Sequence, residues 1–328
     1  MKSYIKNIIL KINILFVIII FLSGCSLHQS ENTNGKINVV TVNFVQYDFA
    51  RAICGDRANV KMIMKPGAEA HGYEPTLSDI IDIEEADVFI YNAGETDVWI
   101  DTLLSSVDTS DTIIVSLMNA DGITLYEEES IFSTHSPKEH THHHSHDNNG
   151  RDFAYDEHIW TSPKNAIPMT KAICDALIKA DNENREYYLN NLRDFTDELK
   201  ILDYDLSSTV ANSKTKLIAV ADRFPFLYMA KDYGLKYMAA FSLCSAEGDA
   251  GPSVIAHMIE EIKRNGIDTV FYIEMSNEKM ADVICEHTGS KKALLHSCQS
   301  ISRADFDAGV TYVDLMKNNI KNLKEALN

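Results

Sequence analysis

Short apolar runs rich in β-branched residues alternate along the chain with longer amphipathic stretches. Eight runs are predicted as β-strands, at residues 37–44, 60–64, 88–93, 112–118, 216–221, 236–241, 269–274 and 293–296. The stretches between most of them, for example 79–86, 254–264 and 278–287, have apolar residues at helical spacing. Strands that alternate with helices indicate parallel sheets covered by helices on both faces. The pattern therefore predicts an α/β fold of two lobes, each with a parallel four-stranded sheet flanked by helices.

Two longer helices are predicted between the two groups of strands. The first covers 163–180. The second covers about 184–212 and has apolar residues at helical spacing, at Tyr188, Leu189, Leu192, Phe195, Leu199, Leu202 and Leu206. We expect this long, rigid helix to join the lobes and to limit their motion. The expected domains are an N-terminal lobe at 37–182, a linking helix at 183–214 and a C-terminal lobe at 215–328.

The first residues have the pattern of an export signal. Three lysines and a mostly apolar run from Ile12 to Leu22 precede Ser23, Gly24 and Cys25. This is typical of a lipoprotein signal peptide at 1–24, which is cut before the cysteine so that Cys25 takes the lipid. A transmembrane anchor is less consistent, because the run is shorter than the roughly 20 residues of a span. With a flexible polar tether at 25–36, the pattern predicts an extracytoplasmic protein anchored to the bacterial cell membrane by lipid.

The net charge argues against one class of partner, and the cysteine spacing argues against one kind of metal site. The formal net charge of the 328 residues is −18, which argues against nucleic acid as a partner. A negative field suits cation capture, and it equally suits the solubility of an exported protein. The five cysteines after Cys25 show no Cys-x-x-Cys spacing, which argues against a structural zinc knot. Three are expected to be buried in helices, and two loop cysteines, Cys244 and Cys298, could pair as a disulfide.

Residues 135–150 differ from the rest of the chain. They contain six of the twelve histidines and no apolar residue, so they cannot contribute to a core and are predicted to form a surface loop. Five histidines of this loop are candidates for an auxiliary metal site, namely His140, His142, His143, His144 and His146.

Three other histidines occupy positions where loops are expected to converge. Ligands of doubly wound sheets lie beyond the carboxyl ends of the strands. His71 follows the strand at 60–64, His158 precedes the helix at 163–180, and His296 ends the strand at 293–296. Each alone is equally consistent with an ordinary loop or half-buried residue. Together they predict a metal site.

Acidic residues could complete that site. Glu247 and Asp222 each follow a strand and could supply oxygen ligands, although both could equally be solvated loop acids or helix caps. For Glu274 we favour a capping or hydrogen-bonding role, and for His257 and His287, inside helices, a structural one. Imidazole nitrogens suit zinc better than manganese, which prefers oxygen.

At these motifs the sequence resembles the zinc/manganese substrate-binding lipoproteins of ABC importers. The resemblance rests on the lipobox at Cys25 and, in order, on the residues at 71–79 (HGYEPTLSD), 156–166 (DEHIWTSPKNA), 233–235 (YGL) and 311–316 (TYVDLM). It implies two lobes joined by one long helix, with the metal between them. It also implies that His71 and His158 are ligands, that a fourth ligand falls at His296, and that a His-rich loop marks members handling zinc.

The sequence departs from the family pattern at one ligand. The resemblance places a third ligand, usually histidine or glutamate, at Arg223. A guanidinium has no lone pair to offer, so Arg223 cannot coordinate. We expect it to pair with an acid such as Asp222 or Glu247, and His296 to supply the missing nitrogen. The remaining ligand is then Glu247 first, with Asp222 or water as alternatives.

The resulting hypothesis is a monomeric binding protein that captures zinc outside the cell and delivers it to an ABC-type permease. A manganese-specific protein of the same type is one alternative. An exported zinc-dependent hydrolase is another, but the sequence has neither a His-Glu-x-x-His motif nor a nucleophile elbow. We therefore predict no catalytic residues. An additional role as a surface adhesin is left open by the sequence.

Overall fold

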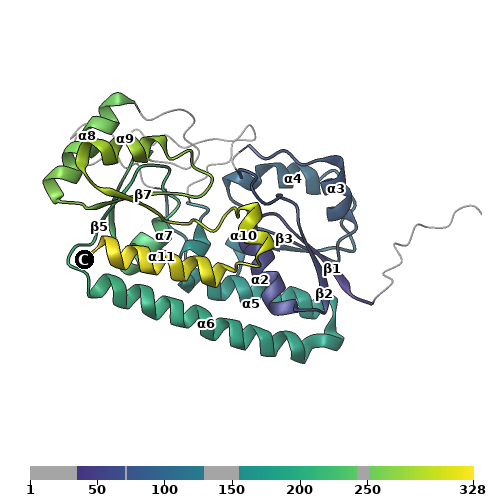
Figure 1. Ribbon diagram of the computed structural model, residues 1–328. Helices are drawn as coiled ribbons and strands as arrows, with labels where there is room; N and C mark the ends of the chain where they lie inside the picture. The colour runs from purple at the N-terminus through teal and green to yellow at the C-terminus, as the bar shows by residue number, and fades with distance from the viewer. Residues whose placement is uncertain (1–34, 71, 129–154, 242–250) are drawn as a thin grey trace, which may run out of the picture. The chain divides into compact units, whose positions relative to one another are not determined.

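Two parallel four-stranded sheets form the framework of the protein (Figure 1). The computed structural model describes residues 35–70, 72–128, 155–241 and 251–328. The first sheet has the order β2-β1-β3-β4, with strands Ile37–Thr41 (β1), Ala58–Met62 (β2), Val88–Tyr91 (β3) and Ile113–Ser116 (β4). The second has the order β6-β5-β7-β8, with strands Leu217–Val220 (β5), Lys236–Ala239 (β6), Thr269–Tyr272 (β7) and Lys291–Leu294 (β8). The predicted α/β fold is confirmed.

Both sheets have the same internal order, and this order decides where a ligand can bind. In each sheet the chain leaves the first strand to one side and returns on its other side, so β1 and β5 lie between neighbours on opposite sides. Loops diverge at such a point, beyond the carboxyl ends of the strands, and leave room for a ligand.

Helices cover these sheets on both faces. The N-terminal half contains α2 (Phe44–Cys54), α3 (Leu77–Glu84), α4 (Val98–Leu104) and α5 (Pro163–Ala180), and the C-terminal half contains α7 (Leu227–Tyr233), α8 (Pro252–Asn265), α9 (Lys279–Thr288), α10 (Arg303–Asp307) and α11 (Tyr312–Ala326). Capping boxes begin α2, α3 and α11, through Asn43 with Gln46, Thr76 with Asp79, and Thr311 with Asp314. Thr76 thus fixes the start of α3.

The first predicted strand is too long. It extends through residue 44 in the sequence pattern, whereas β1 ends at Thr41 and Asn43 already caps α2. The Gln46 side chain accepts hydrogen bonds from the backbone N–H groups of Val42 and Asn43, at 2.9 and 3.1 Å. These bonds favour the helix over a longer strand, although Val42 and Phe44 are as apolar as strand residues.

The long linking helix is present as α6 (Arg185–Ala211) and runs beside both halves of the chain (Figure 1). Its buried residues follow the predicted spacing: Tyr188, Phe195, Leu199, Leu202, Leu206 and Val210. It packs against α2, α5 and α11. Elements from both halves therefore share one helix as a common support.

The main hydrophobic core is continuous between the two sheets. It includes Val39 and Val88 of the first sheet together with Ile218 and Phe271 of the second. The C-terminal segment contributes to this continuity. The ring of Tyr312, at the start of α11, lies edge-on to Phe49 of α2 with ring centroids 4.9 Å apart.

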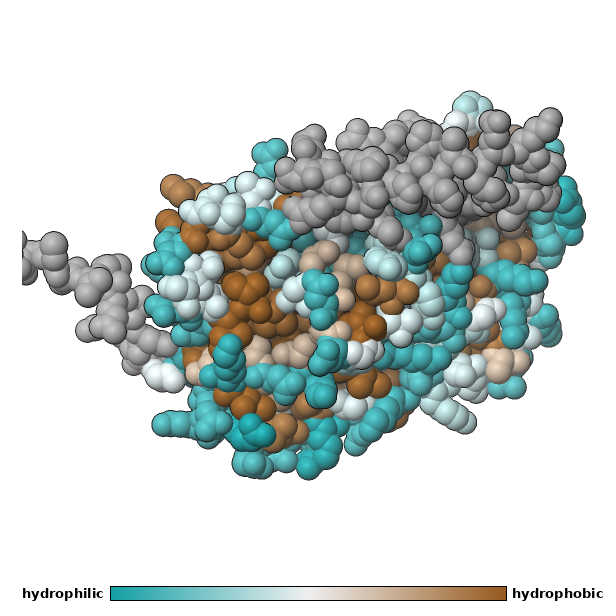
Figure 2. Space-filling view, turned by 180° about the vertical axis from the view of Figure 1, so that it is seen from behind, coloured by the Kyte–Doolittle hydropathy of each residue, from teal (hydrophilic) through white to brown (hydrophobic). Residues whose placement is uncertain are grey.

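Apolar side chains are also exposed on the surface. Figure 2 shows them gathered among hydrophilic ones on the face opposite to Figure 1. Leu77 and Ile81 of α3 and Tyr204 of α6 are examples of large exposed apolar side chains among the described residues. Some exposure of apolar side chains is ordinary on protein surfaces. Within the described part of the chain, no helix is both long and apolar enough to span a bilayer.

Candidate metal site

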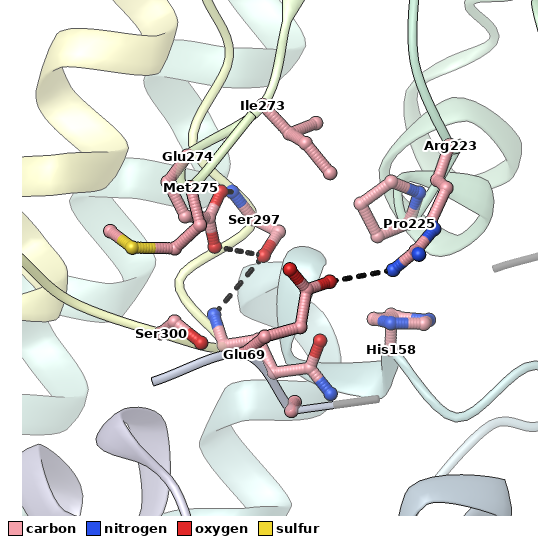
Figure 3. Close-up of a pocket in the computed structure, with 11 residues that line it drawn as sticks. Glu69, His158, Arg223, Pro225, Ile273, Glu274, Met275, Ser297 and Ser300 are labelled. Atoms are coloured by element: carbon pink, nitrogen blue, oxygen red, sulfur yellow. Dashed lines mark hydrogen bonds and ion pairs between the residues drawn. The ribbon is translucent and has the colours of Figure 1, made fainter. Parts of the chain in front are cut away.

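A small cavity lies where loops from both sheets converge (Figure 3). Its lining comes from the segments after β2, β5, β7 and β8 and from the turn before α5, namely Glu69, Ala70, His158, Arg223, Pro225, Ile273, Glu274, Met275, Ser297, Gln299 and Ser300. Its volume is about 30 Å³. This is room for one or two water molecules or an ion, whereas sites for organic ligands are typically about 300 Å³ or more. The geometry therefore favours a small ion as ligand.

His158 is the predicted ligand whose geometry suits coordination. It is 1% exposed and lies directly before the short 3-10 helix η4 (Ile159–Thr161). Its Nδ1 lies 3.2 Å from Asp156 Oδ1, and its ring lies edge-on to Trp160 with centroids 5.3 Å apart. Because a carboxylate only accepts, Nδ1 carries the proton, and in the neutral imidazole Nε2 then carries the lone pair. This is the arrangement of a metal-binding imidazole oriented by a carboxylate.

The neighbouring Glu157 holds this turn against the first sheet. Its Oε2 accepts hydrogen bonds from the backbone N–H and the hydroxyl of Thr96, at 2.9 and 3.0 Å. Its backbone carbonyl accepts one from Asn92 at 2.7 Å. Gly94 is required there, because a Cβ at this position would lie 2.2 Å from both Cβ and Oε2 of Glu157. His158 is thus fixed on a rigid support.

A buried carboxylate, Asp97, organises the same support. Its Oδ2 accepts the N–H groups of Asn92 and Ala93, at 2.8 and 3.1 Å, and Ala93 has a φ of 73°. Burial raises the pKa of Asp97 from 3.8 to about 7, and the nearby Glu157 carboxylate adds to this rise. The folded state therefore retains a proton that the unfolded chain loses near pH 4.

We predict that Asp97→Asn removes a pH-dependent loss of stability. In the wild type, stability falls as pH rises from about 4 to 7, since only the folded state then binds the proton. The full shift corresponds to about 4 kcal/mol. The asparagine oxygen can still accept both N–H groups, so the variant is expected to gain stability over the wild type as pH rises. Urea unfolding at pH 5 and pH 8 tests this, and a difference that does not grow with pH would contradict it.

His296 lies just beyond β8 rather than at its end, and its environment differs from that of His158. Its Nδ1 accepts a hydrogen bond from the backbone N–H of Cys298 at 2.9 Å. In a neutral imidazole the proton is then on Nε2, so neither nitrogen offers a lone pair in this conformation. Its backbone is held by Asn319, which donates to the His296 carbonyl at 2.7 Å. To coordinate a metal, the ring would have to leave its bond with Cys298.

Glu274 is bound to the loop after β8, as expected. It accepts hydrogen bonds from the backbone N–H of Ser297 at 2.7 Å and from the hydroxyl of the same residue. Figure 3 shows this contact at one side of the cavity. The predicted hydrogen-bonding role of Glu274 is confirmed.

Arg223 pairs with an acid that the sequence did not identify. Its Nη1 lies 2.7 Å from Glu69 Oε1, across 154 positions of the chain. Asp222 instead accepts the backbone N–H of Arg223 at 2.9 Å. The prediction of an ion pair is correct, but the partner is Glu69, because the loops after β2 and β5 meet at the cavity.

Gln299 is a cavity residue that the sequence analysis missed. It is 6% exposed, and its Nε2 has no hydrogen-bond partner among the described residues. Rotating the amide by 180° would present its oxygen at the same place, and amide oxygen is a metal donor. One sequence offers no signal for this role, since a glutamine between Cys298 and Ser300 is an ordinary loop residue.

Several predicted residues lie outside the described part of the chain. They are Cys25, His71, the loop histidines His140, His142, His143, His144 and His146, Cys244 and Glu247. Among the residues that are described, no group of three or more His, Cys, Asp or Glu side chains is arranged to hold a metal. Of the residues outside the described part, His71 directly follows Ala70, a cavity residue, in the sequence.

The cysteine predictions have mixed outcomes. Cys54, Cys174 and Cys285 lie in helices as expected, and the first two are buried. Cys298 is a free thiol, so the disulfide considered with Cys244 is not formed. It is fully buried behind His296, and burial raises the pKa of its thiol well above the ordinary value. At the start of α5, the hydroxyl of Ser162 donates to Asp232 and makes no cap.

The fold places an ion-sized cavity where loops from two parallel sheets meet, an arrangement suited to binding a small substrate. The chain belongs to the family of zinc-uptake complex component A, periplasmic, whose sequence profile matches residues 39–326. Proteins of this family act outside the cytoplasm, and they work together with ABC transporter permeases. The predicted family is confirmed.

Individual relatives agree with this assignment. The zinc-binding lipoprotein AdcA of Streptococcus pneumoniae is 30% identical over 310 residues, which cover 93% of this chain but 58% of AdcA. The chain therefore spans little more than half the length of that relative. The high-affinity zinc uptake system protein ZnuA of Bacillus subtilis is 29% identical, over 95% of this chain and 94% of ZnuA.

A solved structure agrees as well. The Zn(II)-bound ZnuA-like domain of Streptococcus pneumoniae AdcA matches with a TM-score of 0.72 and 26% identity. The match covers 89% of this chain and 99% of that domain. The chain thus corresponds to the ZnuA-like part of the longer streptococcal protein.

Proposed function

We propose that this chain captures zinc outside the cytoplasm and delivers it to an ABC-type permease. The observation that carries the proposal is His158, a buried imidazole in an ion-sized cavity, with Nδ1 held by Asp156 and the lone pair on Nε2. Imidazole nitrogen favours zinc over manganese. The relatives named for zinc binding and zinc uptake support the same cargo.

For the ligands we propose His71, His158, His296 and Glu247. His71 and His158 come from the part of the chain that carries the first sheet, and Glu247 follows β6. His296 joins the site only if zinc draws its ring away from the backbone of Cys298. Gln299, which already lines the cavity, is the alternative donor to His296.

The two candidates for this position are separated by comparing His296→Ala with Gln299→Ala. Zinc affinity is measured by calorimetry in competition with a chelator. If His296 is the ligand, we expect its variant to lose at least about 100-fold in affinity and Gln299→Ala to lose little. Ser300→Ala is the matched control, because its hydroxyl lines the cavity but already donates to the Ala68 carbonyl at 3.0 Å. Unchanged affinity in His296→Ala would remove His296 from the ligand set.

The same titration tests the function itself. The mature chain is expected to bind one zinc ion tightly in its cavity, and a large excess of manganese should not displace it. A chain that binds neither metal would contradict the proposal. A preference for manganese would favour the alternative cargo.

We further propose how the protein is held and organised. The lipid on Cys25 would anchor it to the membrane, and residues 25–36 would act as a tether. We propose lobes at 37–182 and 215–328, a linking helix at 183–214, and a monomer without nucleic-acid partners. The histidines of 135–150 would gather zinc for the binding site.

A further inference from the structure

The Arg223–Glu69 ion pair lies in an unusual place for a binding site that takes a cation. Both side chains line the same cavity as His158, and Figure 3 shows the guanidinium directed toward that cavity. The pair joins the loop after β5 to the loop after β2, so it links the two halves of the site. A metal ion held by His158 would therefore lie close to a permanent positive charge.

This pair is poorly suited to a purely structural role. The side chain of Arg223 is 28% exposed and that of Glu69 is 53% exposed. Ion pairs in contact with solvent add little to stability, because water screens the charges and both side chains lose freedom. A weak pair can, however, be broken easily by a competing charge.

The backbone around Arg223 is held more firmly than its side chain. Asp222 accepts the Arg223 N–H at 2.9 Å, and Pro225 restricts the chain two residues later. The side chain has several rotatable bonds and only one described ion-pair partner. A change in the cavity would therefore move the guanidinium while the loop stays in place.

We propose that Arg223 is an internal competitor of the metal cargo, and that Glu69 is its exchangeable counter-ion. This inference rests on zinc capture as proposed above. In the empty site the Arg223 guanidinium supplies the positive charge that the metal cation would otherwise bring to the cavity, and Glu69 neutralises it. An arriving divalent cation repels the guanidinium and attracts the Glu69 carboxylate, so the pair separates.

The consequence is a site tuned for release as well as for capture. Each bound state carries the repulsion between the cation and Arg223, which lowers affinity mainly by speeding dissociation. When the ion leaves, the Arg223–Glu69 pair forms again, and the guanidinium replaces the ion as the positive partner of Glu69. A carrier that must pass its cargo to a permease benefits from this property.

The test compares zinc binding by Arg223→Gln, Glu69→Gln, the double variant and the wild-type mature chain. Affinity comes from chelator competition, and the dissociation rate comes from stopped-flow transfer of zinc to excess chelator. We expect Arg223→Gln to bind at least about tenfold more tightly, chiefly through slower dissociation, since tenfold corresponds to only about 1.4 kcal/mol. Glu69→Gln should bind more weakly, because the guanidinium is no longer neutralised. The double variant should bind more tightly than Glu69→Gln.

Arg303→Gln is the matched control. It removes the same charge from an exposed pair with Asp307 in α10 and lies outside the cavity lining, so its affinity should stay within about twofold of the wild type. Equal or weaker zinc binding by Arg223→Gln overturns the inference and leaves zinc capture intact. If the wild type and all variants fail to bind zinc, zinc capture and the inference fall together.

Discussion

Replacing His158 with alanine is expected to lower zinc affinity by at least about 100-fold. The variant removes an imidazole that is positioned by Asp156 and by the edge of Trp160, and alanine offers no donor atom in its place. Loss of a residue that merely orients a metal ligand already costs about 10- to 100-fold in affinity, so loss of the ligand itself costs more. Calorimetry in competition with a chelator measures the change.

Two comparisons make the His158 result specific. His287→Ala removes an exposed histidine whose Nδ1 contacts the Val283 carbonyl at 2.9 Å in α9, and its zinc affinity should match the wild type. Urea unfolding of His158→Ala shows whether the protein still folds, because the side chain is buried. A folded His158→Ala protein that keeps its affinity within about threefold would exclude His158 as a ligand.

Zinc affinity is also expected to fall by about 1000-fold when the pH is lowered from 7.5 to 5.5. Only neutral imidazole coordinates, and an ordinary imidazole titrates near pH 6.5. One unit below that value, protonation reduces affinity about tenfold for each imidazole ligand. Three imidazoles, the number in the proposed ligand set, give the 1000-fold change, and two would give about 100-fold. The slope of affinity against pH therefore counts the imidazoles.

Loss of zinc in acid must be distinguished from loss of structure. Asp97 acts in the opposite direction, because its raised pKa makes the folded state relatively more stable as the pH falls from 7 toward 4. Circular dichroism at pH 5.5 is expected to show the native protein, and zinc should bind again on return to pH 7.5. Affinity that stays constant from pH 7.5 to 5.5 would contradict an imidazole site.

Most of the fold could be predicted from the sequence because its strands are short, apolar and separated by helical patterns. The bounds of α5 at Pro163–Ala180 agree with the prediction, since proline at the first position marks its start. The strand was predicted to extend over residues 42–44, because a single polar residue, Asn43, within an apolar run is still compatible with a strand. The capping contact with Gln46 decided the structure there.

Candidate site residues could be predicted only where the residue type itself, such as histidine, indicates metal binding. His158 stands out by residue type and by its acidic and aromatic neighbours. The pairing of Arg223 with Glu69 depends on loops from different sheets, and a sequence contains no direct record of that proximity. Gln299 is neutral and common in loops, so only its burial beside the cavity reveals it.

The core that runs unbroken from Val39 to Phe271 has a consequence for how a permease could tell a loaded protein from an empty one. Two halves that share their interior and lean on one helix cannot swing apart without exposing that interior to water, which is costly. The structural difference between the loaded and the empty protein must then lie in the conformation of the loops around the cavity. A permease would then recognise a change in the surface around the opening of the cavity. The distance between the two sheets would be the same in both states.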